Sequence, residues 1–214
     1  MNAIDESQVS AHSDNEHSTK RKILEAARHE FSVHGLAGAR VDQIAVVAGV
    51  NKAMIYYYYQ SKENLHTEVI RDHFQRIGEI LRSRIANPST LEECLAEVLE
   101  GHVRLAQQAP EFIPILVREL ADPRPAFMDQ MAGMMMDTGL PMIIRGKLIE
   151  AQQEGVIRTI DPRQLAISLI TMSIGYFIMA PLVDRIMGVT NHDEFIEQRK
   201  SIILDIFMNG VKAR

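Results

Sequence analysis

Residues 41–60 contain the feature that most constrains the fold, a pair of short helical patterns separated by a glycine. Ala45 is small enough to let two helices approach, Gly49 can turn the chain, and Ile55 can fill the junction between the helices. This spacing is typical of a helix-turn-helix. Any two antiparallel helices joined by a tight turn would also satisfy these three residues, so the spacing leaves both interpretations open.

Helix signals continue on both sides of this segment, and we find no strand pattern. Asn51, Ser61 and the Thr90–Glu93 pair have the spacing of helix caps. Good helix formers supply most of the 46% apolar content, and aromatic residues make up only 6%. We therefore predict an all-α fold. Helices are expected over residues 20–34, 41–48, 52–58, 61–86, 90–108, 110–122, 125–154, from 162 onward and over 193–211, with breaks at Gly133 and at 139–141.

Charge and composition divide the chain into three parts. Residues 1–18 carry four acidic residues, no Lys or Arg and almost no apolar content, so we expect a disordered N-terminal tail. Residues 19–75 carry eight Lys or Arg against six acidic residues, although the net charge of the whole chain is -5. A small basic unit should therefore occupy about residues 19–66, followed by a larger helical unit over residues 67–214.

The residues after Gly49 decide between the two interpretations of the turn. The sequence VNKAMIYYYYQSKE, over residues 50–63, resembles the pattern Val-Ser-x-Gly-Thr-Leu-Tyr-x-Tyr-Phe-x-Ser-Lys-Glu of the TetR family of bacterial transcriptional regulators. The upstream stretches ILEAARHEFSVHG and VDQIAVVAGV also fit, so the resemblance covers about residues 20–68. It implies a three-helix DNA-binding domain over residues 19–66, with the helix-turn-helix at about 41–60, and an effector-binding and dimerisation domain over 67–214.

The resemblance also implies which side chains meet DNA. Tyr59 takes the family's Phe position and should fill the core, whereas Tyr57 falls at a variable position and should enter the major groove. Tyr58 could give its hydroxyl to a phosphate. Packing is the alternative role for the tyrosines. The expected DNA contacts are Arg40, Lys52, Ala53, Met54, Tyr56, Tyr57, Tyr58 and Lys62.

Four of these positions are explained by comparison with the family pattern. Lys62 matches the family lysine that meets the DNA backbone, and the dipole of its helix disfavours a cation there without an external anion. Arg40 stands where the family often has a capping Thr or Ser, so it loses the cap but can reach a phosphate. Ala53 and Met54 replace the family's Gly and Thr, so the operator sequence cannot be transferred from relatives.

Six methionines fall within residues 128–142, and methionine adapts its shape to irregular apolar surfaces. The family resemblance implies a ligand cavity walled by this region, and hence an apolar or aromatic effector. Ordinary helix core is the alternative. His66 and His73, seven residues apart, could share a helix face and are interpreted as surface histidines, with a metal pair as the weaker alternative. The candidate cavity residues are His102, Phe112, Arg118, Phe127, Met131, Met135, Arg145, Thr171 and Tyr176.

Residues 164–183 contain no charged side chain and are long enough to span a bilayer. A helix that is apolar all round can also be buried between its own domain and a partner. The resemblance favours the second interpretation, in which this helix and the last one pair with their symmetry mates in a homodimer, without a membrane. The candidate interface residues are Leu169, Ile170, Phe177, Phe195, Ile202, Ile203, Ile206 and Phe207.

The function expected from the resemblance is a repressor that binds an inverted repeat of double-stranded DNA and is released by a small effector. An activator of the same fold is the alternative. A helical enzyme is a weaker one, because we find no Gly-rich phosphate loop, metal-ligand cluster or nucleophile–His pair. We therefore assign no catalytic residue, metal or cofactor. Cys94 is the single cysteine and no secretory signal is evident, so we expect a cytoplasmic protein.

Overall fold

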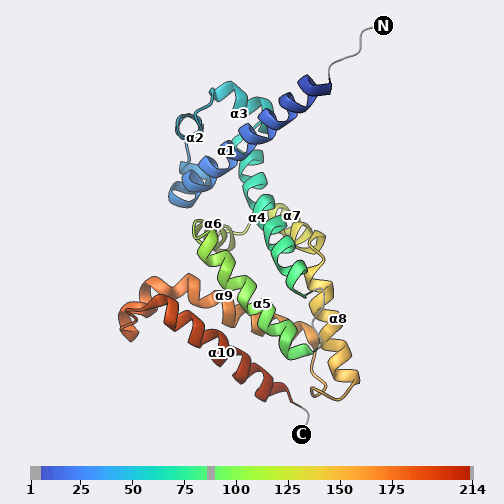
Figure 1. Cartoon of the computed structure of the whole chain (residues 1–214). Helices are drawn as coiled ribbons and strands as arrows, with labels where there is room; N and C mark the ends of the chain where they lie inside the picture. Colours follow the sequence, from blue (N-terminus) through green and yellow to red (C-terminus); the bar gives the residue numbers. More distant parts are fainter. Residues whose placement is uncertain (1–5, 86–89, 213–214) are drawn as a thin grey trace.

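The computed structural model describes residues 6–85 and 90–212, and these residues form an all-α fold, as predicted. Within them the extended pairing is limited to one β-bridge between Ile157 and Lys212. The helices are α1 (Glu6–Gly38), α2 (Val41–Ala48), α3 (Lys52–Tyr59), α4 (Lys62–Ile85), α5 (Leu91–Gln108), α6 (Phe112–Ala121), α7 (Pro125–Asp137), α8 (Leu140–Gln153), α9 (Pro162–Met187) and α10 (His192–Val211) (Figure 1).

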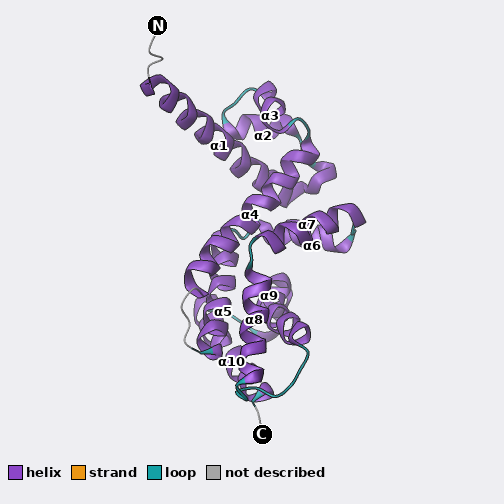
Figure 2. Ribbon diagram, turned by 90° about the vertical axis from the view of Figure 1, so that its right-hand side faces the viewer, coloured by secondary structure: helices purple, strands orange, loops and turns teal. Residues whose placement is uncertain are grey.

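Helix α4 connects the two ends of the molecule. Helices α1, α2 and α3 form one end, and α4 runs from them into the larger group made by α5, α8, α9 and α10 (Figures 1 and 2). Its first half places Val69 and Phe74 in a core with α1, α2 and α3. Its second half places Leu81 and Ile85 in a separate core with α5, α8, α9 and α10. One rigid element therefore belongs to both cores.

The first core does not stop at the three N-terminal helices. Phe31, Ile44 and Ile55 fill it from α1, α2 and α3, while Ile115 of α6 and Met131 of α7 close it from the other side. The domain boundary predicted between residues 66 and 67 thus falls within α4 and within this core. The division into domains stays a prediction.

Several helix ends are formed by the caps that the sequence predicts. Gly49 has φ 66° and ψ 34°, the left-handed conformation that ends α2. The Asn51 side chain accepts a hydrogen bond from the Ala53 N–H at the start of α3. Thr90 and Glu93 form a complete capping box at the start of α5. These local signals fix where α2 stops and where α3 and α5 begin.

Residues 6–18, which belong to the tail expected to be disordered, are helical in the structure and form the first part of α1. No Gly or Pro occurs between residues 6 and 34, so a helix nucleated further along can extend backward one residue at a time. The Lys20 ammonium pairs with Glu16 one turn earlier, at 2.7 Å. Residues 1–5 lie outside the described residues.

Two predicted breaks have different outcomes. Helix α7 continues through Gly133, contrary to our expectation, because one internal glycine costs only about 1 kcal/mol and Met131 and Met134 on the same helix are buried. The break at Gly139 is present, with φ 74°. The stop at His34-Gly35 appears as a kink, since Gly35 has φ 64° and ψ 178° before α1 resumes to Gly38. The expected stop at 87–88 lies outside the described residues.

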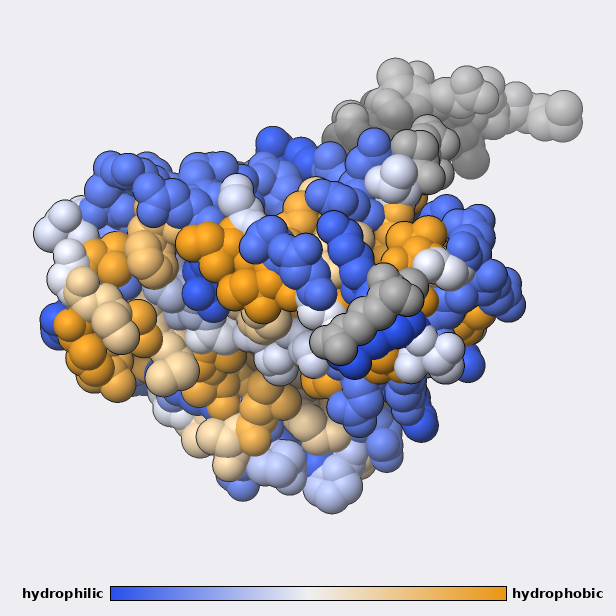
Figure 3. All heavy atoms as spheres, turned by 90° about the horizontal axis from the view of Figure 1, so that it is seen from below, coloured by the Kyte–Doolittle hydropathy of each residue, from blue (hydrophilic) through white to orange (hydrophobic). Residues whose placement is uncertain are grey.

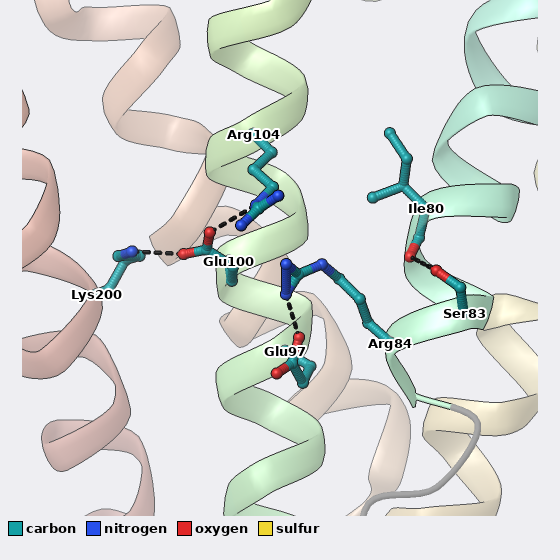
Figure 4. A network of polar contacts seen from close by, with 7 residues as sticks. All are labelled: Ile80, Ser83, Arg84, Glu97, Glu100, Arg104 and Lys200. Carbon is teal, nitrogen blue, oxygen red and sulfur yellow. Dashed lines mark hydrogen bonds and ion pairs between the residues drawn. The ribbon is translucent and has the colours of Figure 1, made fainter.

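Ion pairs hold α5 to its neighbours on two sides (Figure 4). Arg84 of α4 pairs with Glu97 of α5, and Lys200 of α10 pairs with Glu100 of α5. Arg104, one turn along α5, donates to the same Glu100 carboxylate at 2.7 Å. The two cations keep the pKa of Glu100 below its usual value. Helix α5 is thus tied to α4 and α10 by charge as well as by packing.

Candidate functional site

The four tyrosines of α3 occupy different environments. Ile55 and Tyr59, one turn apart, are 1% and 7% exposed and face the first core. The Tyr59 hydroxyl donates to the Lys20 carbonyl of α1 at 3.3 Å, and burial raises the pKa of Tyr59 to about 12. Tyr57 lies on the opposite side and is 78% exposed. The prediction that Tyr59 fills the core is confirmed, and Tyr57 is free to meet a partner.

Tyr58 lies at the edge of this exposed face. Its ring is partly buried and meets the edge of the Tyr57 ring at a centroid distance of 5.1 Å. The Lys20 ammonium lies 5.2 Å from the centroid of the Tyr58 ring. Tyr56 is 42% exposed on the other side of Tyr57. Tyr57, Tyr58 and Lys20 thus form a contacting group of hydroxyl and ammonium donors, and Tyr56 is an exposed neighbour in the sequence of α3.

The start of α3 carries the remaining polar groups of this surface. Lys52 pairs with Asp42 of α2 at 2.9 Å, and both side chains remain about half exposed or more. Ala53 and Met54 are exposed beside it. Arg40 is the N-cap residue of α2 but makes no side-chain cap, as expected, and its own N–H donates to Glu30 Oε1 at 3.0 Å. The exposed Arg40 guanidinium therefore remains available to an anion.

Lys62 has an internal role that the sequence did not indicate. Its ammonium donates to the carbonyl oxygens of Ala37 and Ala39, at 3.2 and 3.1 Å, and so ties the end of α1 to the start of α4. These carbonyls give the cation a reason to be present without an external anion. Contact between Lys62 and a DNA phosphate stays a prediction, for which the third ammonium hydrogen is left.

A cavity of about 890 Å³ lies among α4, α5, α6, the end of α7, α8 and α9. Four of the nine predicted cavity residues line it, namely His102, Phe112, Met135 and Arg145. The exposed Ile167 and Ile170 of α9 also line it, so it opens to solvent in the single chain. Aliphatic and aromatic side chains make up nearly all of the wall, which is the common character of small-molecule sites.

Three of the remaining predicted cavity residues serve the N-terminal core instead. Arg118 of α6 donates to the carbonyl oxygens of residues 31, 32 and 33 of α1. Phe127 and Met131 of α7 are 9% and 7% exposed and pack in the first core. Their assignment to the cavity is wrong because α7 turns these side chains toward α4 and the end of α1. Spacing along α7 could not show which neighbour it packs against.

Thr171 and Tyr176 of α9 are also absent from the cavity wall, so these two assignments are wrong. The Thr171 hydroxyl bonds to the Ile167 carbonyl of its own helix at 2.8 Å. The Tyr176 hydroxyl donates to Asp184 at 2.9 Å, and the Tyr176 ring packs with Phe195 of α10. The cavity lies on another face of α9, which a helix apolar on all sides does not reveal in its sequence.

His66 and His73 are not surface residues, contrary to our interpretation. His66 is 2% exposed and its Nε2 lies 3.4 Å from Glu119, while His73 is 6% exposed and lines the cavity. The His73 ring stacks on Phe112 with centroids 3.4 Å apart. Burial, aided by the charges of Arg28 and Arg76, lowers the pKa of His73 to about 3. Their spacing on one face of α4, the core face of that helix, was the signal available in the sequence.

The predicted dimer residues divide into three groups. Leu169, Ile203 and Phe207 are 5% exposed or less and fill the second core of their own chain, so they cannot form an intermolecular surface as predicted. Ile202 and Ile206 of α10 are 56% and 55% exposed. Of the other three, Ile170 and Phe177 line the cavity, and Phe195 is partly buried against Tyr176.

Helix α9 adds its own exposed apolar residues to this region, including Met179, Leu182, Ile186 and Met187, each more than half exposed. Hydrophobic side chains cover much of the end of the molecule seen from below (Figure 3). With a mean hydropathy of 1.9, α9 is long and apolar enough to cross a membrane, and only 17% of that stretch is buried. The same surface would suit a partner helix.

The exposed tyrosine helix, set behind a glycine turn on a small helical core, defines a DNA-binding protein of the helix-turn-helix class. Residues 23–69 match the model of the bacterial regulatory proteins of the tetR family. This match identifies residues 23–69 as similar to the DNA-binding region of the TetR family of transcriptional regulators.

Known relatives extend this similarity over nearly the whole chain. The regulator RutR of Escherichia coli K12 is 29% identical over 203 residues, which are 91% of each chain. The repressor NicS of Pseudomonas putida is 37% identical over 105 residues, 47% of this chain and 48% of NicS. These relatives are named as transcriptional regulators, which supports the same class of function here.

Solved structures share the fold. The regulator FadR of Bacillus subtilis, solved with stearoyl-CoA, has a TM-score of 0.75 at 20% identity and covers 89% of this chain and 98% of its own. A TetR family regulator of Marinobacter aquaeolei has a TM-score of 0.70 at 18% identity, covering 94% and 100%. At 18–20% sequence identity, these similarities show a shared arrangement of helices and nothing about the ligand or the DNA sequence.

Proposed function

We propose that this chain is a ligand-responsive repressor that binds an inverted repeat as a homodimer and leaves DNA when an apolar effector binds. The observation that carries the proposal is the position of α6 between the cavity and the DNA-binding end. Phe112, Ile113 and Leu116 of α6 line the cavity. Arg118, at the other end of the same short helix, holds three carbonyls of α1. A ligand that moves α6 would therefore pull on α1.

We assign recognition of the DNA sequence to the exposed face of α3 and to the neighbouring residues at the starts of α2 and α4. Tyr57 is the side chain best placed to enter the major groove, where a phenol can donate to a base and press on a thymine methyl. Arg40 and Lys52 flank it as cations for phosphates or base edges. Tyr56, Tyr58, Ala53, Met54 and Lys62 complete the proposed surface.

Dimerisation would supply a second DNA-binding domain. Ile202 and Ile206 of α10, with the exposed apolar residues of α9, are the surface proposed for a second copy. A two-fold dimer of this kind would set its recognition helices roughly 34–36 Å apart, in successive major grooves of an inverted repeat. Such a regulator acts in the cytoplasm, where the DNA is.

Release requires an effector that binds one conformation of the dimer better than the other, and the population shift cannot exceed that difference in affinity. The apolar wall of the cavity supports an apolar effector. The FadR structure of similar fold holds stearoyl-CoA, a ligand with a long apolar chain, which is consistent with this class.

The proposal is tested by selecting binders from random duplex DNA at near-physiological salt and sequencing the enriched pool. We expect an inverted repeat with half-sites about one helical turn apart. The enriched duplex then serves to screen apolar compounds for release. Binding without any enriched sequence would contradict the proposal, because only attraction to the DNA backbone would remain.

A further inference from the structure

The polar groups of the cavity are few and of one sign. Of the described residues that line it, those with polar side chains are His73, His102, Arg145 and Arg163, and none is acidic. Among these described residues there is also no Ser, Thr, Asn, Gln or Tyr. A ligand that fills this cavity therefore meets apolar surface, two imidazoles and two guanidinium groups.

The two histidines lie at the buried end and are uncharged near neutral pH. His73 is 6% exposed and stacks on Phe112, and no hydrogen bond joins its ring to the described residues. His102 Nδ1 lies 2.8 Å from the Ser173 hydroxyl, and burial lowers the pKa of His102 to about 4. This end can contact an apolar group or form one neutral hydrogen bond, but it provides no positive charge.

The two arginines lie at the open end. Arg163 pairs with Asp161 at 2.6 Å, so its charge is already matched. Arg145 of α8 is exposed and makes no hydrogen bond or ion pair with the described residues. The Asp161 carboxylate has its pKa lowered mainly by Arg163 and to a smaller extent by Arg145. Two guanidinium groups beside one carboxylate leave one positive charge at the mouth.

We infer that the effector is an amphiphilic acid, with an apolar body among α4, α5 and α6 and a single anionic group bound by Arg145 at the mouth. This rests on the proposed function, since it takes the cavity as the effector site. A guanidinium can bind a carboxylate through two parallel hydrogen bonds, which an alcohol cannot reproduce. A cationic ligand of the same shape is disfavoured, because the one unmatched charge at the mouth, that of Arg145, is positive.

The test compares ligands that share one apolar part and differ only in carrying a carboxylate or a hydroxyl group. Dodecanoate and dodecanol, and in parallel 4-phenylbutanoate and 4-phenylbutanol, are titrated calorimetrically below their aggregation limits into the full chain. The variants are Arg145→Gln and, as a matched control, Arg158→Gln, an exposed arginine outside the cavity wall. For each ligand, the affinity for a variant is divided by the affinity for the wild-type chain, so the different hydrophobicity of acid and alcohol does not affect the comparison.

We expect Arg145→Gln to weaken binding of the better-fitting acid by about tenfold or more, the size of a charge-assisted hydrogen bond, and to change the matching alcohol less than about threefold. Arg158→Gln should leave both unchanged. Equal effects of Arg145→Gln on acid and alcohol, or failure of both acids to bind the wild-type chain, would overturn the inference.

Release of the selected DNA duplex is measured with the same four compounds. If the alcohols release DNA and the acids do not, the repressor proposal stands and the inference about charge is wrong. If the acids bind through Arg145 but leave DNA affinity unchanged, the inference about the cavity stands and ligand-controlled repression is wrong.

Discussion

At the scale of single residues, the four tyrosines show how much a helical register determines. Each residue of α3 is rotated by about 100° from the one before it. Once Ile55 is fixed in the core, Tyr59 must follow it inward and Tyr57 must point away, as their 7% and 78% exposures show. The sequence predicts these directions because one apolar anchor and the helix period are enough.

The proposed DNA contacts predict separate effects for two substitutions. Tyr57→Ala should change the base preference found by selection, because it would remove the side chain proposed to enter the groove. Arg40→Ala should weaken all sequences alike and reduce the salt slope by about one, because it would remove a proposed phosphate contact. Arg40 is preferred over Lys62 for this comparison, since Lys62 also holds two carbonyls of the protein. Equal loss at every site for both variants would disprove the groove assignment of Tyr57.

Buried histidines make stability depend on pH. Burial lowers the pKa of His73 to about 3 and that of His102 to about 4, whereas the ordinary value is 6.5. Above pH 6.5 these histidines are neutral in both the folded and the unfolded chain. Below it the unfolded chain binds more protons, so the free energy of unfolding should fall by about 1.4 kcal/mol per pH unit for each histidine until its folded pKa is reached.

Urea unfolding between pH 7 and pH 5 measures this slope. His73→Phe retains an aromatic ring against Phe112 but cannot bind a proton, so its slope should be smaller than that of the wild-type chain by the share of one histidine. An unchanged slope would mean that His73 is already accessible to protons in the folded protein.

At the scale of elements, helix ends were predictable and helix faces often were not. Caps such as Asn51 and Thr90–Glu93 act within four residues, so the sequence contains all that is needed to place them. The faces of α9 depend on neighbours far along the chain. Leu169 is buried and Ile170 is 37% exposed, although both are apolar residues in one uncharged stretch.

Arg118 is the clearest case of a role that depends on distant residues. Its partners, the carbonyls of residues 31, 32 and 33, lie more than 80 positions away. Arg118→Ala should lower the free energy of unfolding by about 1 kcal/mol, since carbonyls at the end of α1 lose a charged donor. It should also weaken the effect of an effector on DNA affinity. Urea unfolding and effector titrations of the DNA complex measure these two changes.

The matched control is Arg185→Ala, because Arg185 also donates to a backbone carbonyl but within its own helix α9. It should leave the response to effector intact. If Arg118→Ala and Arg185→Ala behave alike, α6 does not couple the cavity to α1 through this contact.

At the scale of the whole molecule, the exposed apolar residues of α9 and α10 require an explanation. Ile202, Ile206 and Met187 are more than half exposed on neighbouring helices of one chain. Stable interfaces bury roughly 800 Å² on each partner, and apolar side chains dominate their centres. The sequence showed an uncharged stretch in α9 and an apolar stripe in α10, but the structure was needed to separate the outward residues from Ile203 and Phe207.

We expect the double variant Ile202→Glu with Ile206→Glu to be monomeric, because two carboxylates and their symmetry mates would lose water without partners at the centre of the proposed interface. The folded monomer should persist, since neither side chain is part of the second core. Light scattering measures the mass of the variant, and titration of the selected duplex measures its DNA affinity. The affinity should fall sharply, because the DNA-binding domain of a monomer can occupy only one half-site.

Val156→Glu is the control, since Val156 is 46% exposed in the turn between α8 and α9 and a charge there meets only water. It should remain dimeric and keep its DNA affinity. A double variant that stays dimeric would place the interface elsewhere. A wild-type chain that sediments with membranes after a salt wash would instead assign the apolar face of α9 to lipid, because bilayer and partner helix compete for the same side chains.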